Sequence, residues 1–107
     1  MATPADNPMG ALTDRERAHE TARFLKVLAN ENRLMVLCSL NDGELTVGAL
    51  HQRVPLSQSA LSQHLAVLRR EGFVITRREA QTIYYRIAEP RVHQLMPVVC
   101  DLFSDPT

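Results

Sequence analysis

The stretch from residue 57 to residue 70 reads Ser-Gln-Ser-Ala-Leu-Ser-Gln-His-Leu-Ala-Val-Leu-Arg-Arg, and its periodicity predicts an α-helix with two unlike faces. Leu61, Leu65 and Leu68 recur at intervals of four and three residues, which places them in one apolar stripe. The opposite side carries small hydroxyls, an amide and a guanidinium, from Ser59, Ser62, Gln63, Ala66 and Arg70. A merely solvated helix face usually carries more Glu and Lys.

Small polar side chains of this kind suit contact with DNA. Hydroxyl, amide and guanidinium groups can approach a phosphate backbone closely and hydrogen-bond to base edges in the major groove. We therefore interpret residues 57–70 as a DNA recognition helix. The alternative is an ordinary solvated helix face.

Capping signals predict three helices before this one. The capping box Thr13-Asp14-Arg15-Glu16, with Thr13 as N-cap, begins a first helix that runs to about Ala29. Asn30 can cap a second helix, Glu31 to Leu40, and Thr46 a short third helix that ends at about Arg53. The expected inward faces are Ala18, Ala22, Leu25 and Leu28 in the first helix and Leu34, Leu37 and Leu40 in the second.

The pattern changes after Gly72, which ends the helix capped by Ser57. Residues 73–78 and 82–87 are rich in Val, Ile, Thr and Tyr and flank Glu79-Ala80-Gln81, which predicts a β-hairpin with a short polar turn. Pro90 begins a final helix to about Phe103, with Leu95, Val99 and Leu102 on one side. Pro97 lies inside this helix and is expected to kink or shorten it.

The predicted order is α-α-α-α-β-β-α, a mainly α fold with one β-hairpin. Two helices joined by a tight turn and followed by a hairpin are typical of a winged helix-turn-helix. In that architecture the third helix crosses the DNA backbone and the fourth enters the major groove. The hairpin, or wing, lies along the adjacent phosphates or minor groove.

Length and composition fit a single domain of 107 residues that is 45% hydrophobic and has no Trp. We expect residues 1–12 to form a disordered tail and residues 13–107 to form a DNA-binding and dimerisation domain. No apolar run is long enough to span a membrane, and residues 1–12 lack the basic cluster of a signal peptide, so we expect the cytoplasm. The two cysteines are then not expected to form a structural disulfide.

Charge distribution supports a nucleic-acid partner, although the formal net charge is zero. Within residues 57–91, six arginines face three glutamates, whereas the segments on either side are net acidic. The positive charge therefore gathers on the segment that is predicted to touch DNA. The arginines concerned are Arg69, Arg70, Arg77, Arg78, Arg86 and Arg91.

The chain resembles the ArsR/SmtB family of bacterial winged-helix repressors over roughly residues 18–103. The resemblance is carried by Leu-Ala-Asn-Glu-Asn-Arg-Leu at 28–34, Glu-Leu-Thr-Val-Gly-Ala-Leu at 44–50, Leu-Ser-Gln-Ser-Ala-Leu-Ser-Gln-His-Leu at 56–65 and Leu-Arg-Arg-Glu-Gly at 68–72. It implies a homodimer, built from the first and last helices, that binds an inverted-repeat operator and leaves it when an inducer arrives.

The resemblance also bears on what the protein senses. The family's metal sensors carry cysteines where this chain has Thr46 and Gly48, and the final helix offers only His93 toward a zinc site, so no metal site is expected. Val36-Leu37-Cys38 and residues 77–82 instead resemble the sulfide- and redox-sensing branch, which implies that Cys38 and Cys100 form a disulfide or polysulfide bridge. In that branch the second cysteine lies about one turn later, near Ser104. The alternative is a pair of buried, inert thiols.

These inferences give a set of candidate DNA contacts: Ser57, Gln58, Ser59, Ser62, Gln63, His64, Arg69, Arg70, Arg77, Arg78 and Gln81. Arg69 and Arg70 are expected to position phosphates, and His64 could either contact phosphate or hydrogen-bond inside the domain. Arg77, Arg78 and Gln81 fit a wing, with a solvated turn as the alternative.

No catalytic constellation or cofactor motif is visible, so we do not expect an enzyme. The leading hypothesis is a repressor released from DNA by thiol oxidation or persulfidation. The alternatives are a repressor that responds to a metal or another ligand, and a winged-helix protein-interaction module that does not bind DNA. The sequence leaves the operator, the regulated genes and the natural inducer open.

Overall fold

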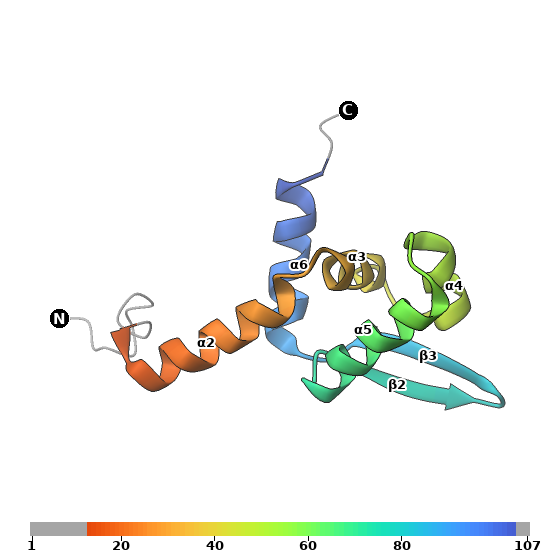
Figure 1. Ribbon diagram of the computed structural model, residues 1–107, viewed down its shortest axis with the longest axis horizontal. Coiled ribbons are helices and arrows are strands. Elements are labelled where there is room, and N and C mark those ends of the chain that lie inside the picture. The colour runs from red at the N-terminus through yellow and green to blue at the C-terminus, as the bar shows by residue number, and fades with distance from the viewer. Residues whose placement is uncertain (1–12, 105–107) are drawn as a thin grey trace. The chain divides into compact units, whose positions relative to one another are not determined.

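A computed structural model of the chain describes residues 13–104 (Figure 1). The expected N-terminal tail, residues 1–12, lies outside this range. The chain divides into two compact units, the first ending at Asn30 and the second beginning at Glu31. No helix in the described range is long and apolar enough to cross a membrane.

The first unit contributes helix α2, Arg15–Leu28. The N-cap is Asp14, not Thr13 as predicted, because the Asp14 carboxylate accepts a hydrogen bond from the backbone N–H of Glu16 at 2.9 Å. Of the predicted apolar face only Leu28 is buried, together with Val27, while Leu25 is 50% exposed.

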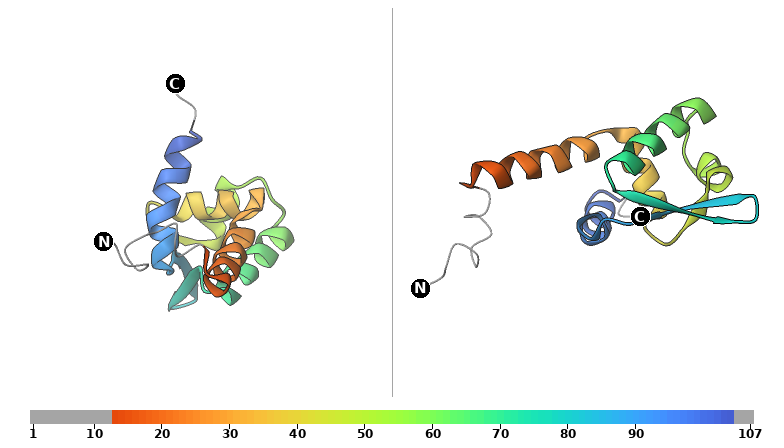
Figure 2. Two further views of the ribbon diagram at one scale, coloured as in Figure 1. Left: turned by 90° about the vertical axis from the view of Figure 1, so that its left-hand side faces the viewer. Right: turned by 90° about the horizontal axis from the view of Figure 1, so that it is seen from below.

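The second unit contains all the other elements (Figures 1 and 2). Its helices are α3 (Glu31–Leu40), α4 (Val47–Arg53), α5 (Gln58–Arg70) and α6 (Pro90–Leu102). Its strands are β1 (Leu45–Thr46), β2 (Val74–Glu79) and β3 (Thr82–Ile87), in the sheet order β1-β3-β2. The predicted hairpin is therefore confirmed but extended by a third strand, since β1 pairs antiparallel with Tyr84 and Tyr85 of β3.

Buried leucines and valines hold this unit together. Leu37 of α3, Leu50 of α4 and Leu61 of α5 have no exposed surface, so the two helices of the helix-turn-helix share one core with α3. The N-termini of α4 and α5 are capped by the residues that the sequence predicts. Thr46 Oγ1 accepts a hydrogen bond from the N–H of Ala49, and Ser57 Oγ accepts one from the N–H of Ala60, both at 3.1 Å.

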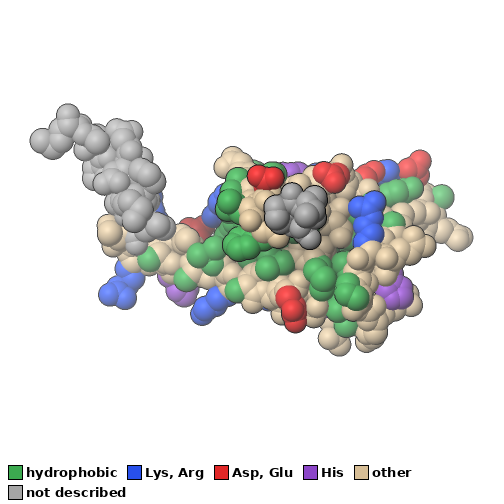
Figure 3. All heavy atoms as spheres, turned by 90° about the horizontal axis from the view of Figure 1, so that it is seen from above, with side chains coloured by type: hydrophobic (Ala, Val, Ile, Leu, Met, Phe, Trp, Pro, Cys, Tyr) green, Lys and Arg blue, Asp and Glu red, His purple; other side chains and the backbone are tan. Residues whose placement is uncertain are grey.

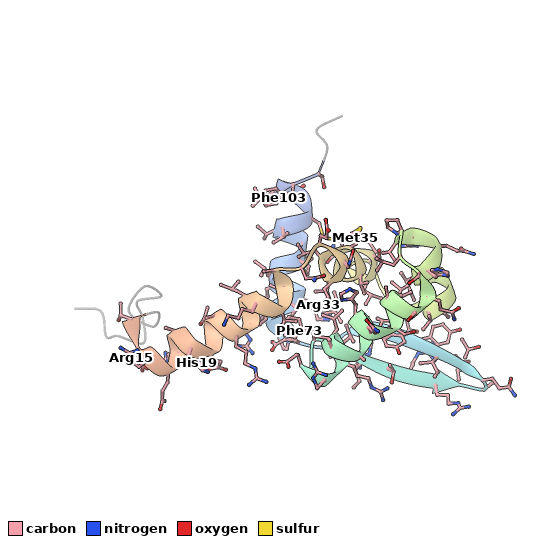
Figure 4. The ribbon with its side chains drawn as sticks, viewed as in Figure 1. Arg15, His19, Arg33, Met35, Phe73 and Phe103 are labelled. Carbon is pink, nitrogen blue, oxygen red and sulfur yellow. The ribbon has the colours of Figure 1, made fainter. Side chains whose placement is uncertain are left out.

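The end of α5 fixes the start of the hairpin. Gly72 has φ +79°, and two hydrogen bonds close the helix: Phe73 N–H donates to the Leu68 carbonyl at 2.8 Å and Gly72 N–H to that of Arg69 at 3.1 Å. This is a Schellman motif, which needs a left-handed residue after the C-cap. The buried Phe73 ring lies where α5 meets β2 (Figure 4), so the motif couples the recognition helix to the wing.

The buried face of α6 differs from the prediction. Val92 and Met96 have no exposed surface, whereas Leu102 is 70% exposed, and α6 continues through Pro97 instead of ending there. Apolar residues occur almost all around this helix, so periodicity did not identify the side that packs. The apolar side chains left outside form a surface that we call the α6 patch, made of Val98, Leu102 and Phe103.

Candidate nucleic-acid interface

Helix α5 presents its polar side chains to solvent and its leucines to the core. Leu61, Leu65 and Leu68 are buried. The residues predicted to meet DNA from this helix are exposed: Ser59, Ser62, Gln63, Arg69 and Arg70. The predicted two-faced helix is thus present, with its polar side available to a ligand.

The N-terminus of α5 adds backbone donors to this face. The hydroxyl oxygen of Ser57 already accepts the capping bond from Ala60, yet its O–H remains able to donate, and Gln58 is exposed in the first turn. The first N–H groups of a helix carry a partial positive charge that favours phosphate. Ser57 and Gln58 therefore lie at the end of the helix that is best suited to an anionic backbone.

The strand register divides the hairpin side chains between two faces. Thr76 pairs with Tyr85, and Arg77 pairs with Tyr84, so neighbouring residues alternate between the faces. One face begins at the buried pair Val74 and Ile87 and continues outward through Thr76, Tyr85, Arg78 and Ile83. Tyr85 on this face lines a hollow together with residues of α5, so this is the face on the α5 side.

Arg78 and Gln81 lie at the exposed tip of the wing. Arg78 shares the α5-side face and its Nε donates to the carbonyl of Ala80 at 3.1 Å, which leaves the rest of the guanidinium exposed. Gln81 lies in the two-residue turn between β2 and β3 and is exposed. Both positions are compatible with backbone contact beside a recognition helix.

Arg77, in contrast, is engaged within the protein. It lies on the opposite hairpin face, where its Nε donates to both carboxylate oxygens of Glu44 at 2.9 Å and its Nη1 donates to Glu79 Oε2 at 2.8 Å. Its guanidinium carbon is also 4.2 Å from the centroid of the Tyr84 ring. The charge of Arg77 is therefore compensated by two carboxylates, and the side chain ties the wing to the segment before β1.

This ion pair predicts a titration result. The hydrogen bonds from Arg77 lower the pKa of Glu44 below its ordinary value. The pair therefore contributes above the ordinary pKa of glutamate and is lost as the pH falls through the lowered value. In the Arg77→Met variant the pKa of Glu44 should rise to near its ordinary value, as measured by NMR of the side-chain carboxyl carbon. An unchanged Glu44 pKa in that variant would show that the pair does not form in solution.

His64 is directed inward and not to the exposed face of α5. It is half-buried, its Nε2 lies 3.4 Å from Nδ2 of Asn32 on α3, and its Nδ1 has no hydrogen-bond partner among the described residues. Of the two roles that the sequence leaves open for His64, this position fits the one inside the domain. There it connects the recognition helix with α3.

The two cysteines meet although they are 62 positions apart in the sequence. Cys38 of α3 and Cys100 of α6 are both half-buried free thiols that line one hollow with Leu34, Val99, Phe103 and Ser104. Burial, the hydrogen bond with Cys100 and the charge that Cys100 can carry together raise the pKa of Cys38 to about 12, with burial the largest cause. The Cys38 thiol is therefore protonated at neutral pH.

A helix-turn-helix whose second helix exposes small polar groups, followed by a β-hairpin, defines a winged helix-turn-helix DNA-binding domain. The sequence profile described as "Bacterial regulatory protein, arsR family" matches residues 30–76. The chain is also 46% identical over 96 residues to "Transcriptional activator HlyU" of Vibrio cholerae, covering 90% of this chain and 89% of that protein. The chain belongs to the ArsR family: it is a DNA-binding transcriptional regulator and not an enzyme.

Solved structures of relatives share the fold. "Reduced HlyU from Vibrio cholerae N16961" superposes with a TM-score of 0.82 at 45% identity, covering 88% of this chain and 99% of that one. The "transcriptional repressor BigR from Xylella fastidiosa" gives 0.77 at 43% identity, covering 83% and 88%. The "homodimeric winged helix-turn-helix DNA-binding domain" Mb0332 from Mycobacterium bovis gives 0.70 at 36% identity, covering 83% and 84%.

Proposed function

We propose that this protein is a repressor that binds an inverted-repeat operator as a homodimer and is released when Cys38 and Cys100 are oxidised or persulfidated. The DNA-binding part of this proposal rests on one observation: α5 exposes a polar face on the side opposite its buried leucines. Ser59 and Gln63 would read base edges from the major groove, because the N-terminal half of a recognition helix lies deepest there. As such a regulator acts on the bacterial chromosome, we expect it in the cytoplasm.

Backbone contacts would come from both sides of this helix. Ser57 and Gln58 would contact phosphate at the helix N-terminus, Arg69 and Arg70 near its C-terminus, and Arg78 and Gln81 from the wing. Arg77 would hold the wing in place through Glu44 instead of binding phosphate itself. His64 would support the position of α5 from within.

The homodimer is supported by the apolar side chains that the fold leaves outside. Val98, Leu102 and Phe103 of the α6 patch are 52%, 70% and 84% exposed, and Leu25 on α2 is 50% exposed. Figure 3 views the face on which α6 ends, and hydrophobic side chains gather around it. Burying such a patch against a second copy would stabilise a dimer. The solved relative Mb0332 is described as homodimeric.

The names of the relatives do not agree on whether such a protein represses or activates transcription. BigR is named a repressor, whereas HlyU is named an activator. We assign repression because a winged helix on an operator blocks access to that DNA without further parts, while activation needs contact with an additional protein. Half-sites one helical turn apart, about 34–36 Å, would make operator affinity sensitive to small changes in the dimer.

The sulfur mechanism is supported by the juxtaposition of the two thiols. A hydrogen bond links Cys38 and Cys100 across the contact between α3 and α6. Removing two electrons and two protons from the pair would give a disulfide within one subunit, and a polysulfide donor would supply extra sulfur atoms to the bridge. Either product would change how α6, with its exposed patch, sits on α3. That one solved relative is described as reduced HlyU is consistent with a redox-active member.

The raised pKa of Cys38 predicts an order of reaction. Because the Cys38 thiolate is disfavoured at neutral pH, Cys100 should react first with an oxidant or alkylating agent and Cys38 should close the bridge. Replacing Cys100 by Ser should lower the pKa of Cys38, since the charge that Cys100 can carry disappears. The test is the rate of Cys38 alkylation by iodoacetamide against pH in wild type and in Cys100→Ser.

The release step is tested by gel shift with the protein's own promoter region and polysulfide. Wild type should leave the DNA and lose two hydrogens as the bridge forms, with the added mass of one or more sulfur atoms if the bridge is a polysulfide and no added mass if it is a simple disulfide. Cys38→Ser and Cys100→Ser should stay bound, with all variants binding equally when reduced. Release of Cys38→Ser by polysulfide would remove Cys38 from the mechanism.

A further inference from the structure

A hollow separates the recognition helix from the wing, and it joins three candidate contacts of α5 to a residue of the sheet that is not among them. It is an open depression of about 480 Å³ lined by Ser62, Leu65, Ala66, Arg69 and Arg70 of α5 and by Tyr85 of β3. Figure 1 shows α5 running beside the β2–β3 hairpin, and Figure 2 shows the same arrangement from other directions. Tyr85 is the one lining residue from the sheet.

The geometry of B-DNA indicates what would face this hollow in a complex. A helix in the major groove and a wing along the adjacent minor groove are on either side of a single sugar–phosphate strand. Whatever lies between the helix and the wing must therefore face that strand. The hollow lies between α5 and β3, and its lining residues Ser62, Ala66, Arg69 and Arg70 belong to the exposed side of α5.

The lining chemistry suits a phosphodiester. The Ser62 hydroxyl and the guanidinium groups of Arg69 and Arg70 supply donors from the helix, and the phenol of Tyr85 supplies one from the sheet. Arg70 is only loosely paired, at 4.0 Å from Glu71. Ala66 leaves room for the approach of a backbone, and Leu65 provides an apolar floor. Among the described residues, no acidic side chain lines this hollow.

We propose that this hollow is a phosphate subsite in which the Tyr85 hydroxyl donates a hydrogen bond to the DNA strand between the two grooves. The inference rests on the proposed function as a DNA-binding regulator and adds a contact that composition and charge did not indicate. Tyr85 would act together with Ser62 from the opposite wall. Because the contact is to backbone, it would strengthen binding to every duplex sequence alike.

The neighbouring tyrosine offers a matched control. Tyr84 lies on the other face of the same strand, beneath Arg77, and is half-buried like Tyr85. We expect Tyr85→Phe to weaken binding about 100-fold, for the operator and for a scrambled duplex, because each protomer of the dimer loses one hydrogen bond to a charged group. Tyr84→Phe should bind within about twofold of wild type. Equal affinity of both variants and wild type would overturn the proposal.

A scan of the DNA backbone keeps the test independent of folding effects. In a series of duplexes, each carries one neutral methylphosphonate linkage at a different position. The affinity of wild type and of Tyr85→Phe is measured for every duplex, and the melting temperatures of both proteins are compared. One linkage should weaken wild type by a larger factor than it weakens Tyr85→Phe, because the variant has already lost its tyrosine contact to that phosphate and keeps only those from α5. If every linkage affects both proteins equally, Tyr85 makes no backbone contact. If wild type binds no duplex at all, the proposed function itself fails.

Discussion

The double variant Ser59→Ala, Gln63→Ala is expected to bind an operator duplex at least about 1,000-fold more weakly than wild type. Both side chains are exposed on the N-terminal half of α5, where a recognition helix reaches base edges. A good side-chain contact to a base edge contributes roughly 1–3 kcal/mol of discrimination, and each protomer of a dimer would lose two of them. The operator is first obtained by selecting bound duplexes from a random pool with wild type.

A scrambled duplex serves as the control for this variant. Phosphate contacts from Arg69, Arg70 and Arg78 are unchanged, so affinity for the scrambled sequence should stay within about threefold of wild type. The melting temperature should also be unchanged, because neither side chain is buried. A variant that still prefers the operator as strongly as wild type does would contradict the assignment of α5 as the reading element.

The second large effect concerns stability. Leu61→Ala is expected to lower the free energy of unfolding by about 2–5 kcal/mol, because the Leu61 side chain has no exposed surface and truncation leaves a cavity. For a unit of this size the melting temperature should fall by roughly 10–30 °C. Thermal unfolding followed by circular dichroism measures the loss.

Ile83→Ala is the comparison for this experiment. Ile83 lies near the tip of the wing and is 42% exposed, so the same measurement should show a loss below about 1 kcal/mol. The contrast between the two variants tests whether the leucine stripe anchors α5. Similar losses in both would mean that α5 is not held by the stripe.

Local signals in the sequence predicted most of the fold. The caps Thr46 and Ser57, the termination at Gly72 and the leucine stripe of α5 each depend on neighbouring residues and are found where expected. Their energetics are local, since a cap satisfies N–H groups within one turn and an apolar stripe follows from the helical repeat.

Features set by distant residues were not predictable in this way. Strand β1 has two residues and exists only because Leu45 and Thr46 pair with β3, so it has no periodicity of its own. The buried side of α6 depended on what packs against it, and Val92 and Met96 are buried instead of Leu102.

The residues of the candidate site also fall into those that local sequence predicts and those that depend on distant residues. Exposure of Ser59, Ser62 and Gln63 followed from the helix period, whereas the pairing of Arg77 with Glu44 spans 33 residues and removes that arginine from the set of free charges. Tyr85, which we propose as a phosphate contact, is not among the predicted contacts because tyrosines in a strand are ordinary for packing and carry no signal for DNA. The hairpin register together with alternation could have placed Tyr85 and Arg78 on one face, if the turn had been assigned as two residues.

The central claim is that DNA lies against the polar face of α5 and the wing. Titrating isotope-labelled protein with the selected operator duplex, and following amide NMR shifts, tests it most directly. The account predicts the largest shifts at residues 57–70 and 78–85, with small ones around the α6 patch at 98–103. Largest shifts at the α6 patch with none in α5, or no shifts with any duplex, would contradict it.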